Sequence, residues 1–193
     1  MAIIPKEFYL RDPEVVARDL LGAVIVRIYR DVKLSCRIVE TEAYYGVEDP
    51  ASRARRGGDL ARTLYGDVGV ALVYGIHRQW LFNIVAHEEG YGGAVLIRAA
   101  EPLEGIDVMM GLRGACSVRN LMNGPGKLTK ALAVGKEFHR KPVYVRDYGL
   151  WLEYGTRVSS GDVVRSYRVG VTADLDKPLR FYIRGSPYVS RSR

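Results

Sequence analysis

The stretch Arg37-Ile38-Val39-Glu40-Thr41-Glu42-Ala43-Tyr44-Tyr45 has the composition of a β-strand that carries two carboxylates and an aromatic pair. Because successive side chains of a strand point to opposite faces, a regular strand places Ile38, Glu40, Glu42 and Tyr44 on one face. The two carboxylates then lie roughly 7 Å apart, where repulsion raises one pKa and favours a general acid or base. The alternative is that both glutamates are solvated on an exposed face, as most are.

A polar loop follows this strand and ends in Arg53-Ala54-Arg55-Arg56-Gly57-Gly58. Residues 46–67 show no helical or strand period, and a long loop inside a compact domain is usually functional or mobile. Arginines within a dozen residues of paired carboxylates suggest chemistry beside a polyanion.

The residues before this strand predict a short helix and a first strand. Asp12 is the expected N-cap, Pro13 the first helical residue and Gly22 the stop signal. The runs 23–29 and 34–39, joined by a polar link at 30–33, predict a β-hairpin whose second strand leads into Glu40 and Glu42.

A second hairpin is predicted from residues 68–75 and 79–85, with Tyr74, Ile76, His77 and Arg78 at its tip. An aromatic and a basic residue at an exposed tip suit contact with a nucleic acid. The alternative is purely structural, because hairpin tips often carry Tyr and Gly.

A third buried strand, 94–100, is interrupted by Arg98. A charge in an apolar run is costly unless it is paired, so we expect Arg98 to meet a carboxylate, with Glu42 or Glu101 as the candidates. The alternative is an arginine at a strand end that reaches solvent.

The segment Asn123-Gly124-Pro125-Gly126-Lys127 is a Gly-rich turn that opens a helix, after a helix expected over 102–112. Backbone N–H groups and Lys127 could hold a phosphate there, although the pattern is not a P-loop and a simple helix start explains it equally well. Further strands are expected at 150–153, 163–171 and 179–184.

Composition points to one soluble domain with an anionic partner. The 193 residues carry 29 Lys and Arg against 22 Asp and Glu, a net charge of +7, and the chain ends in the basic tail Arg191-Ser192-Arg193. The two cysteines, Cys36 and Cys116, have no ligand spacing, so we expect no metal site and no disulfide framework. No signal peptide or membrane span is evident, which predicts an intracellular protein.

Four blocks together resemble the alkyladenine (3-methyladenine, methylpurine) DNA glycosylases. They span residues 37 to 187 in the family's order: 37–44, 98–105, 123–128 and 177–187. The resemblance implies an α+β fold, one mixed domain over residues 1–193 around a curved antiparallel β-sheet with a protruding β-hairpin. It also implies a monomer that needs no cofactor and acts on double-stranded DNA containing damaged purines, in the cytoplasm, nucleoid or nucleus.

The resemblance assigns the catalytic residues. Glu42 matches the general base that activates a water for attack on C1′ of the deoxyribose, leaving an abasic site. Arg98 and the backbone carbonyl of Val169 match the groups that help to hold that water. Because no lysine nucleophile is needed, the enzyme is expected to be monofunctional.

The resemblance also assigns binding residues and implies that the damaged base is flipped out of the stack. Tyr44 matches an aromatic that stacks on the base, Asn83 matches a residue that screens the purine N2 region, and Tyr74 matches the wedge that fills the gap. His77, Arg78 and Lys127 are expected to contact DNA.

Two residues depart from the family pattern. Arg53 aligns where the family usually has a histidine, and Ala71 where it has a second pocket aromatic; two extra residues precede Trp80. The departures leave open which lesion is preferred. They also keep open a protein of the same fold that binds damaged DNA without turnover, and an enzyme of a small anionic substrate with its phosphate site near Lys127.

Overall fold

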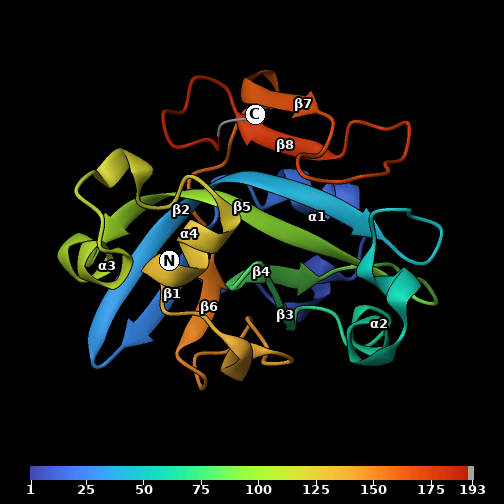
Figure 1. Cartoon of the computed structure of the whole chain (residues 1–193), viewed down its shortest axis with the longest axis horizontal. Coiled ribbons are helices and arrows are strands. Elements are labelled where there is room, and N and C mark those ends of the chain that lie inside the picture. Colours follow the sequence, from blue (N-terminus) through green and yellow to red (C-terminus); the bar gives the residue numbers. More distant parts are fainter. Residues whose placement is uncertain (191–193) are drawn as a thin grey trace.

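One open antiparallel sheet of eight strands organises the computed structural model, which describes residues 1–190 (Figure 1). The basic tail expected at Arg191-Ser192-Arg193 lies outside the described residues. The main path runs β3-β4-β5-β2-β1-β6, and β7 joins it through β8, which pairs with β2. The strands are β1 (Val24–Tyr29), β2 (Val32–Tyr45), β3 (Ala71–Ile76), β4 (Gln79–Val85), β5 (Gly93–Glu104), β6 (Leu150–Glu153), β7 (Val163–Ser166) and β8 (Arg180–Ile183).

Short helices cover both faces of this sheet. The helix α1 begins where the sequence predicts, because Asp12 accepts a hydrogen bond from the N–H of Glu14. Its residues, with those of α3 and α4, join the main core on one face, whereas α2 covers a smaller cluster on the other. The α-helices are α1 (Pro13–Asp19), α2 (Gly58–Leu64), α3 (Ile106–Arg113) and α4 (Pro125–Ala131); the 3-10 helices are η1 (Lys6–Tyr9), η2 (Arg53–Arg56), η3 (Val118–Asn120), η4 (Lys136–Phe138) and η5 (Ser160–Asp162).

The α+β class and the curved antiparallel sheet are confirmed, and both predicted hairpins form. β1 and β2 are joined by the two-residue turn Arg30-Asp31, and β3 and β4 by the turn His77-Arg78. All four turn residues have positive φ, between 47° and 65°, as tight hairpins of this twist require.

A β-bulge in β2 changes the expected faces of its side chains. Ile38 lies opposite Ala100 and Glu40 opposite Ala99, so Val39 is an extra residue without a partner in β5. Ile38 therefore packs in the main core. The prediction that Ile38 shares a face with the glutamates was wrong, because the extra residue reverses the alternation.

A second register shift follows between Glu40 and Thr41, where Arg98 is the extra residue of β5, and from Thr41 on the pairing is regular and builds the second face of the sheet. Leu72, Asn83, Leu96 and Glu42 lie in one row across β3, β4, β5 and β2. Asn83 and Glu42 are therefore two strand spacings apart, roughly 10 Å. Residues on either side of this row, including Ala43 and Ile84, enter the main core instead.

Some boundaries differ from those expected. The segment 46–67 is not wholly a loop, since it contains η2 and α2. Residues 102–104 continue β5, and the following helix begins only at Ile106. The strand expected from residue 68 begins at Ala71, and β7 ends at Ser166. The differences at strand ends arise because tertiary pairing fixes element ends that local sequence leaves open.

Three further observations bear on function. Among residues 1–190, no helix is both long enough and apolar enough to span a bilayer. Within the same residues, no cluster of His, Cys, Asp or Glu is placed to hold a metal ion. Cys36 is a buried free thiol whose pKa is raised by burial, so it is a core residue.

Candidate active site

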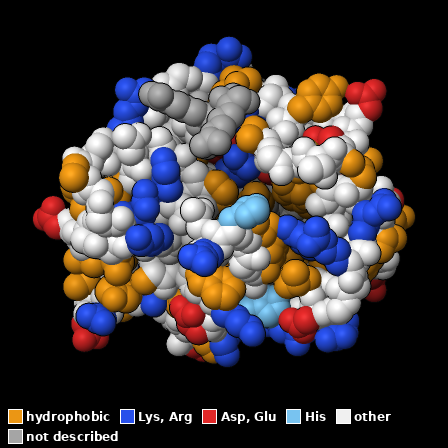
Figure 2. Space-filling view, in the orientation of Figure 1, with side chains coloured by type: hydrophobic (Ala, Val, Ile, Leu, Met, Phe, Trp, Pro, Cys, Tyr) orange, Lys and Arg blue, Asp and Glu red, His pale blue; other side chains and the backbone are white. Residues whose placement is uncertain are grey.

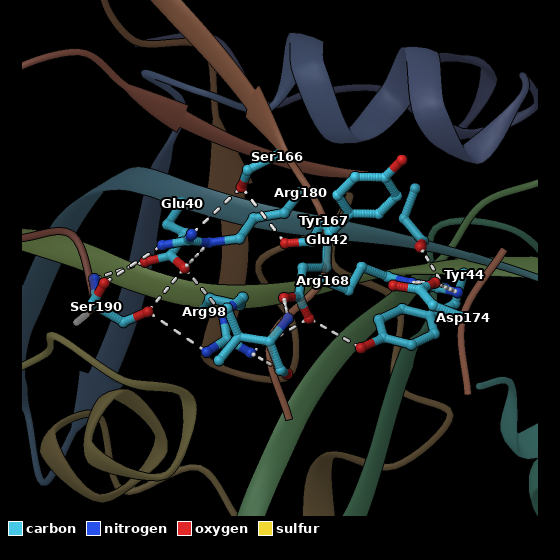
Figure 3. A network of polar contacts seen from close by, with 12 residues as sticks. Glu40, Glu42, Tyr44, Arg98, Ser166, Tyr167, Arg168, Asp174, Arg180 and Ser190 are labelled. Atoms are coloured by element: carbon cyan, nitrogen blue, oxygen red, sulfur yellow. Dashed lines mark hydrogen bonds and ion pairs between the residues drawn. The ribbon is translucent and has the colours of Figure 1, made fainter. Parts of the chain in front are cut away.

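Glu42 is a fully buried carboxylate held by three hydrogen bonds (Figure 3). The N–H of Val169 donates to its Oε1 at 2.7 Å, and Tyr44 Oη and Arg98 Nη1 donate to its Oε2 at 2.8 and 3.2 Å. Burial raises the pKa of Glu42, and these three donors oppose that rise only in part. An ionised carboxylate offers about four acceptor positions, so one remains on Oε1 for a water molecule.

Arg98 joins the two glutamates of β2. Its Nε donates to Glu40 Oε1 at 2.9 Å, and its Nη1 lies 3.4 Å from the carbonyl oxygen of Val169 as well as near Glu42. The guanidinium is almost wholly buried and forms an ion pair with Glu42. The prediction that Arg98 meets a carboxylate is therefore confirmed, with Glu42 as the partner. The other candidate, Glu101, pairs with Arg37 instead.

Glu40 accepts hydrogen bonds from residues that lie far away in the sequence. Arg180 Nε donates to Glu40 Oε1 at 2.8 Å. The N–H of Ser190 donates to Oε2 at 2.6 Å and its hydroxyl to Oε1 at 2.7 Å. With Arg98 these contacts surround the buried Glu40 with four donors from the protein, so its carboxylate orients Arg98.

Tyr44 is supported from behind by a buried arginine. The guanidinium carbon of Arg168 lies 4.4 Å from the centroid of the Tyr44 ring. Arg168 also pairs with both oxygens of Asp49, at 2.6 and 2.8 Å, and with Asp174 at 2.9 Å. These contacts tie the loop after β2 and the segment after β7 to the side chain that touches Glu42.

Tyr74 and Asn83 lie on the same face as Glu42. The Asn83 amide is buried and donates to the carbonyl oxygen of Leu72 at 3.0 Å. Burial raises the pKa of the Tyr74 hydroxyl, and the nearby Arg53 and Asn83 side chains oppose that rise. Tyr74 therefore sits within β3, packed against the smaller hydrophobic cluster, rather than at the hairpin tip where we expected it.

The hairpin tip consists of His77 and Arg78, both exposed. It borders a groove of about 660 Å³ that Lys127, Lys130 and Arg113 also line. Three predicted DNA contacts, His77, Arg78 and Lys127, are thus brought together on one basic groove. Lys127 Nζ donates to Asn123 Oδ1 at 2.7 Å.

Gly126 explains how α4 reaches this hairpin. A Cβ at this position would lie 1.7 Å from Gln79 Oε1 and 2.9 Å from Gln79 Cβ, so only glycine permits the start of α4 to pack against β4. The Gly-rich turn is therefore required by packing as well as by helix initiation. Figure 2 shows this face of the molecule, hollowed near its centre over hydrophobic side chains, with Lys and Arg side chains around the hollow.

Sequence reasoning missed the supporting residues of the site. Ser190, Arg180, Arg168, Asp49 and Asp174 are polar groups that the fold brings to Glu40 and Tyr44 from 119 to 150 residues away, or from the neighbouring loop. Arginines inside the predicted strands 163–171 and 179–184 were the available signal, since buried arginines require carboxylates. The sequence does not say which carboxylates those are.

Comparison with known proteins gives a consistent picture. A family described as "Methylpurine-DNA glycosylase (MPG)" matches residues 7–187. A protein of Aeropyrum pernix named "Putative 3-methyladenine DNA glycosylase" is 48% identical over 193 residues, covering 99% of this chain and 94% of its own. Proteins of the same name from Carboxydothermus hydrogenoformans and Methanoculleus marisnigri are 40% and 41% identical, covering 98% and 97% of this chain and 99% and 98% of theirs.

Proposed function

The chain belongs to the methylpurine-DNA glycosylase family, and from this premise we propose that it flips a damaged purine out of duplex DNA and hydrolyses its N-glycosidic bond. The observation that carries the proposal is the buried Glu42, bound by Arg98 and Val169 with one acceptor position left over. We further propose that the chain works as one glycosylase domain and as a monomer on alkylated and deaminated purines.

The proposed reaction is a displacement at C1′. A water held by Glu42, Arg98 and the Val169 carbonyl loses a proton to Glu42 while its oxygen bonds to C1′. The C1′–N9 bond breaks, and its electron pair leaves with the purine. Because the nucleophile is water and not an amine, no covalent enzyme intermediate forms and the product is an abasic site, as expected for a monofunctional enzyme.

The raised pKa of Glu42 suits this role. A base whose pKa lies closer to neutral takes a proton from water more readily than an exposed carboxylate does, provided that it is ionised at the working pH. Arg98 favours the ionised form and is itself held by Glu40. Glu40 is thus a positioning residue for the base.

The base pocket is proposed between the row of Glu42 and Asn83 and the aromatic side chains beside it. Tyr44 stacks on the flipped purine, and Asn83 screens its N2 edge. Since Tyr74 lies within β3, on the face that also carries Leu72, Asn83 and Glu42, we propose it as a second aromatic contact, in place of the wedge role that the resemblance implied. The gap in the duplex is then filled from the tip, by His77 and Arg78.

Single-turnover base release tests the function. The substrate is a duplex with one hypoxanthine or one 7-methylguanine, and the variants are Glu42→Gln and, as a matched control, Glu101→Gln, whose carboxylate pairs with Arg37 away from the site. We expect Glu42→Gln to lose release by about 100-fold or more while it still binds the duplex, and Glu101→Gln to behave as wild type.

Two results would contradict the proposal. Unchanged release by Glu42→Gln would remove Glu42 from the chemistry. Tight binding of the damaged duplex by the wild type without any base release would instead make the chain a damaged-DNA binding protein of this fold.

A further inference from the structure

Of the three arginines in η2, only Arg53 turns toward the candidate pocket. Arg55 and Arg56 are exposed, whereas Arg53 is half-buried, with its guanidinium carbon 5.1 Å from the centroid of the Tyr74 ring. We propose that Arg53 is a specificity-determining residue that disfavours positively charged purines and so shifts the enzyme toward neutral lesions. This inference rests on the proposed function and names its substrate class.

The charge of Arg53 is not neutralised locally. Among residues 1–190, no carboxylate forms an ion pair with Arg53, and its guanidinium lies over the Tyr74 ring. Arg168, which lies over the other pocket aromatic, Tyr44, differs in this respect because Asp49 and Asp174 both pair with it. Arg53 therefore projects the less compensated positive charge toward a base stacked beside these rings.

The two classes of damaged purine differ by one charge. N3- and N7-alkylated purines are cations, and a bare aromatic ring attracts them through its π-face. Hypoxanthine and etheno-adenine are neutral. The guanidinium of Arg53 already lies over the ring of Tyr74, so this ring cannot attract a cationic base in the same way. Instead, Arg53 repels a second positive charge at close range. A neutral purine loses no such attraction and can stack on the same rings.

The buried acidic groups act in the opposite direction. Three buried carboxylates, Glu40, Glu42 and Asp49, balance three buried arginines, Arg98, Arg168 and Arg180, when Glu42 is ionised. The half-buried Asp174, which also pairs with Arg168, leaves this cluster with one surplus negative charge. Without Arg53 this surplus would draw a cationic purine inward. Arg53 supplies the compensating charge at the rim, and its removal should favour cationic lesions.

The test compares release of 7-methylguanine and of hypoxanthine by the same variant. Arg53→Gln removes the charge, Arg53→Lys keeps it, and Arg55→Gln removes an exposed arginine of the same helical turn. We expect Arg53→Gln to raise the ratio of 7-methylguanine to hypoxanthine release about ten-fold, the effect of one partly screened charge interaction. Arg53→Lys and Arg55→Gln should keep the wild-type ratio.

The outcomes separate the inference from the function on which it rests. An unchanged ratio in Arg53→Gln, or an equal fall in release of both lesions, would show that Arg53 does not select by charge while leaving the glycosylase intact. An altered ratio in Arg55→Gln would replace the local role by a general field effect. A wild type that releases neither base would overturn the proposed function and the inference with it.

Discussion

At the scale of single residues, Tyr44 combines a ring and a hydroxyl that act on different partners. The ring rests on Arg168, and the hydroxyl donates to Glu42 at 2.8 Å. Stacking and acid–base tuning therefore depend on one side chain, and a substitution can separate them. The sequence supported the stacking role through resemblance alone. It placed Tyr44 and Glu42 on one strand face, but the contact of the hydroxyl with the carboxylate depends on side-chain directions that only the folded structure shows.

We expect Tyr44→Phe to move the acidic limb of the pH–rate profile to higher pH. The hydroxyl stabilises ionised Glu42, so its removal raises the pKa of Glu42 further, and the ionised base is lost at a pH where the wild type retains it. The other groups that face Glu42 stay in place: Arg98 from β5, Glu40 from β2 and the N–H of Val169.

The measurement is single-turnover release of 7-methylguanine across the pH range. Release well above the limb should stay near wild type, since Phe keeps the ring. Tyr45→Phe is the matched control, because its hydroxyl contacts Asp12 and Lys177 on the opposite side of β2. A limb that does not move in Tyr44→Phe would exclude the hydroxyl from tuning the base.

At the scale of elements, the β3–β4 hairpin shows what local sequence can and cannot predict. Alternating apolar runs on either side of a short polar link predicted both hairpins, because turn chemistry and strand period are local. The depth of Tyr74 within β3 was not predictable in the same way. The position of Tyr74 depends on the register of β3 with β4, in which Leu72 lies opposite Asn83. This register places the turn at His77 and Arg78, beyond Tyr74.

Because the backbone at this tip is strained, we expect that relieving the strain raises the stability of the protein and weakens its binding to DNA. His77 and Arg78 have φ of 49° and 61°, a region that costs a residue with a side chain about 1 kcal/mol or more. Replacing them with Asn-Gly should stabilise the protein by about 1–2 kcal/mol in urea unfolding and weaken its binding to duplex DNA.

The β1–β2 hairpin offers the matched control for this trade. Its turn residues, Arg30 and Asp31, have φ of 47° and 65°. Asn-Gly at this turn should stabilise the protein to a similar extent and leave DNA binding unchanged. If the tip variant binds duplex DNA as tightly as the wild type, the β3–β4 tip does not contact DNA.

At the scale of the whole molecule, the excess of basic residues matters for association with DNA. The net charge of +7 includes the groove residues Lys127 and Lys130, which lie beside the proposed wedge residues His77 and Arg78. A chain that neutralises several phosphates releases counterions, so its affinity falls steeply with salt. Composition predicted an anionic partner, but only the fold shows that the hairpin and α4 contribute to one basic surface.

We expect Lys127→Gln to weaken binding of any duplex, damaged or not, and to reduce the slope of log affinity against log salt by about 1. Lys33→Gln, which removes an exposed lysine paired with Glu104 near the β1–β2 turn, should leave the slope unchanged. Equal slopes for wild type and Lys127→Gln would show that Lys127 makes no phosphate contact.

The contact between Ser190 and Glu40 also affects when the site can form during synthesis of the chain. The two residues are 150 positions apart, and Arg180 is 140 positions from the same carboxylate. During synthesis from the N-terminus, β2 and β5 can pair long before either partner has emerged from the ribosome. Until then Glu40 has only Arg98, so the arrangement that fixes Arg98 against Glu42 is completed only after residues 180 and 190 have been synthesised. A nascent chain can therefore pair β2 with β5 early, and it acquires the proposed catalytic geometry late.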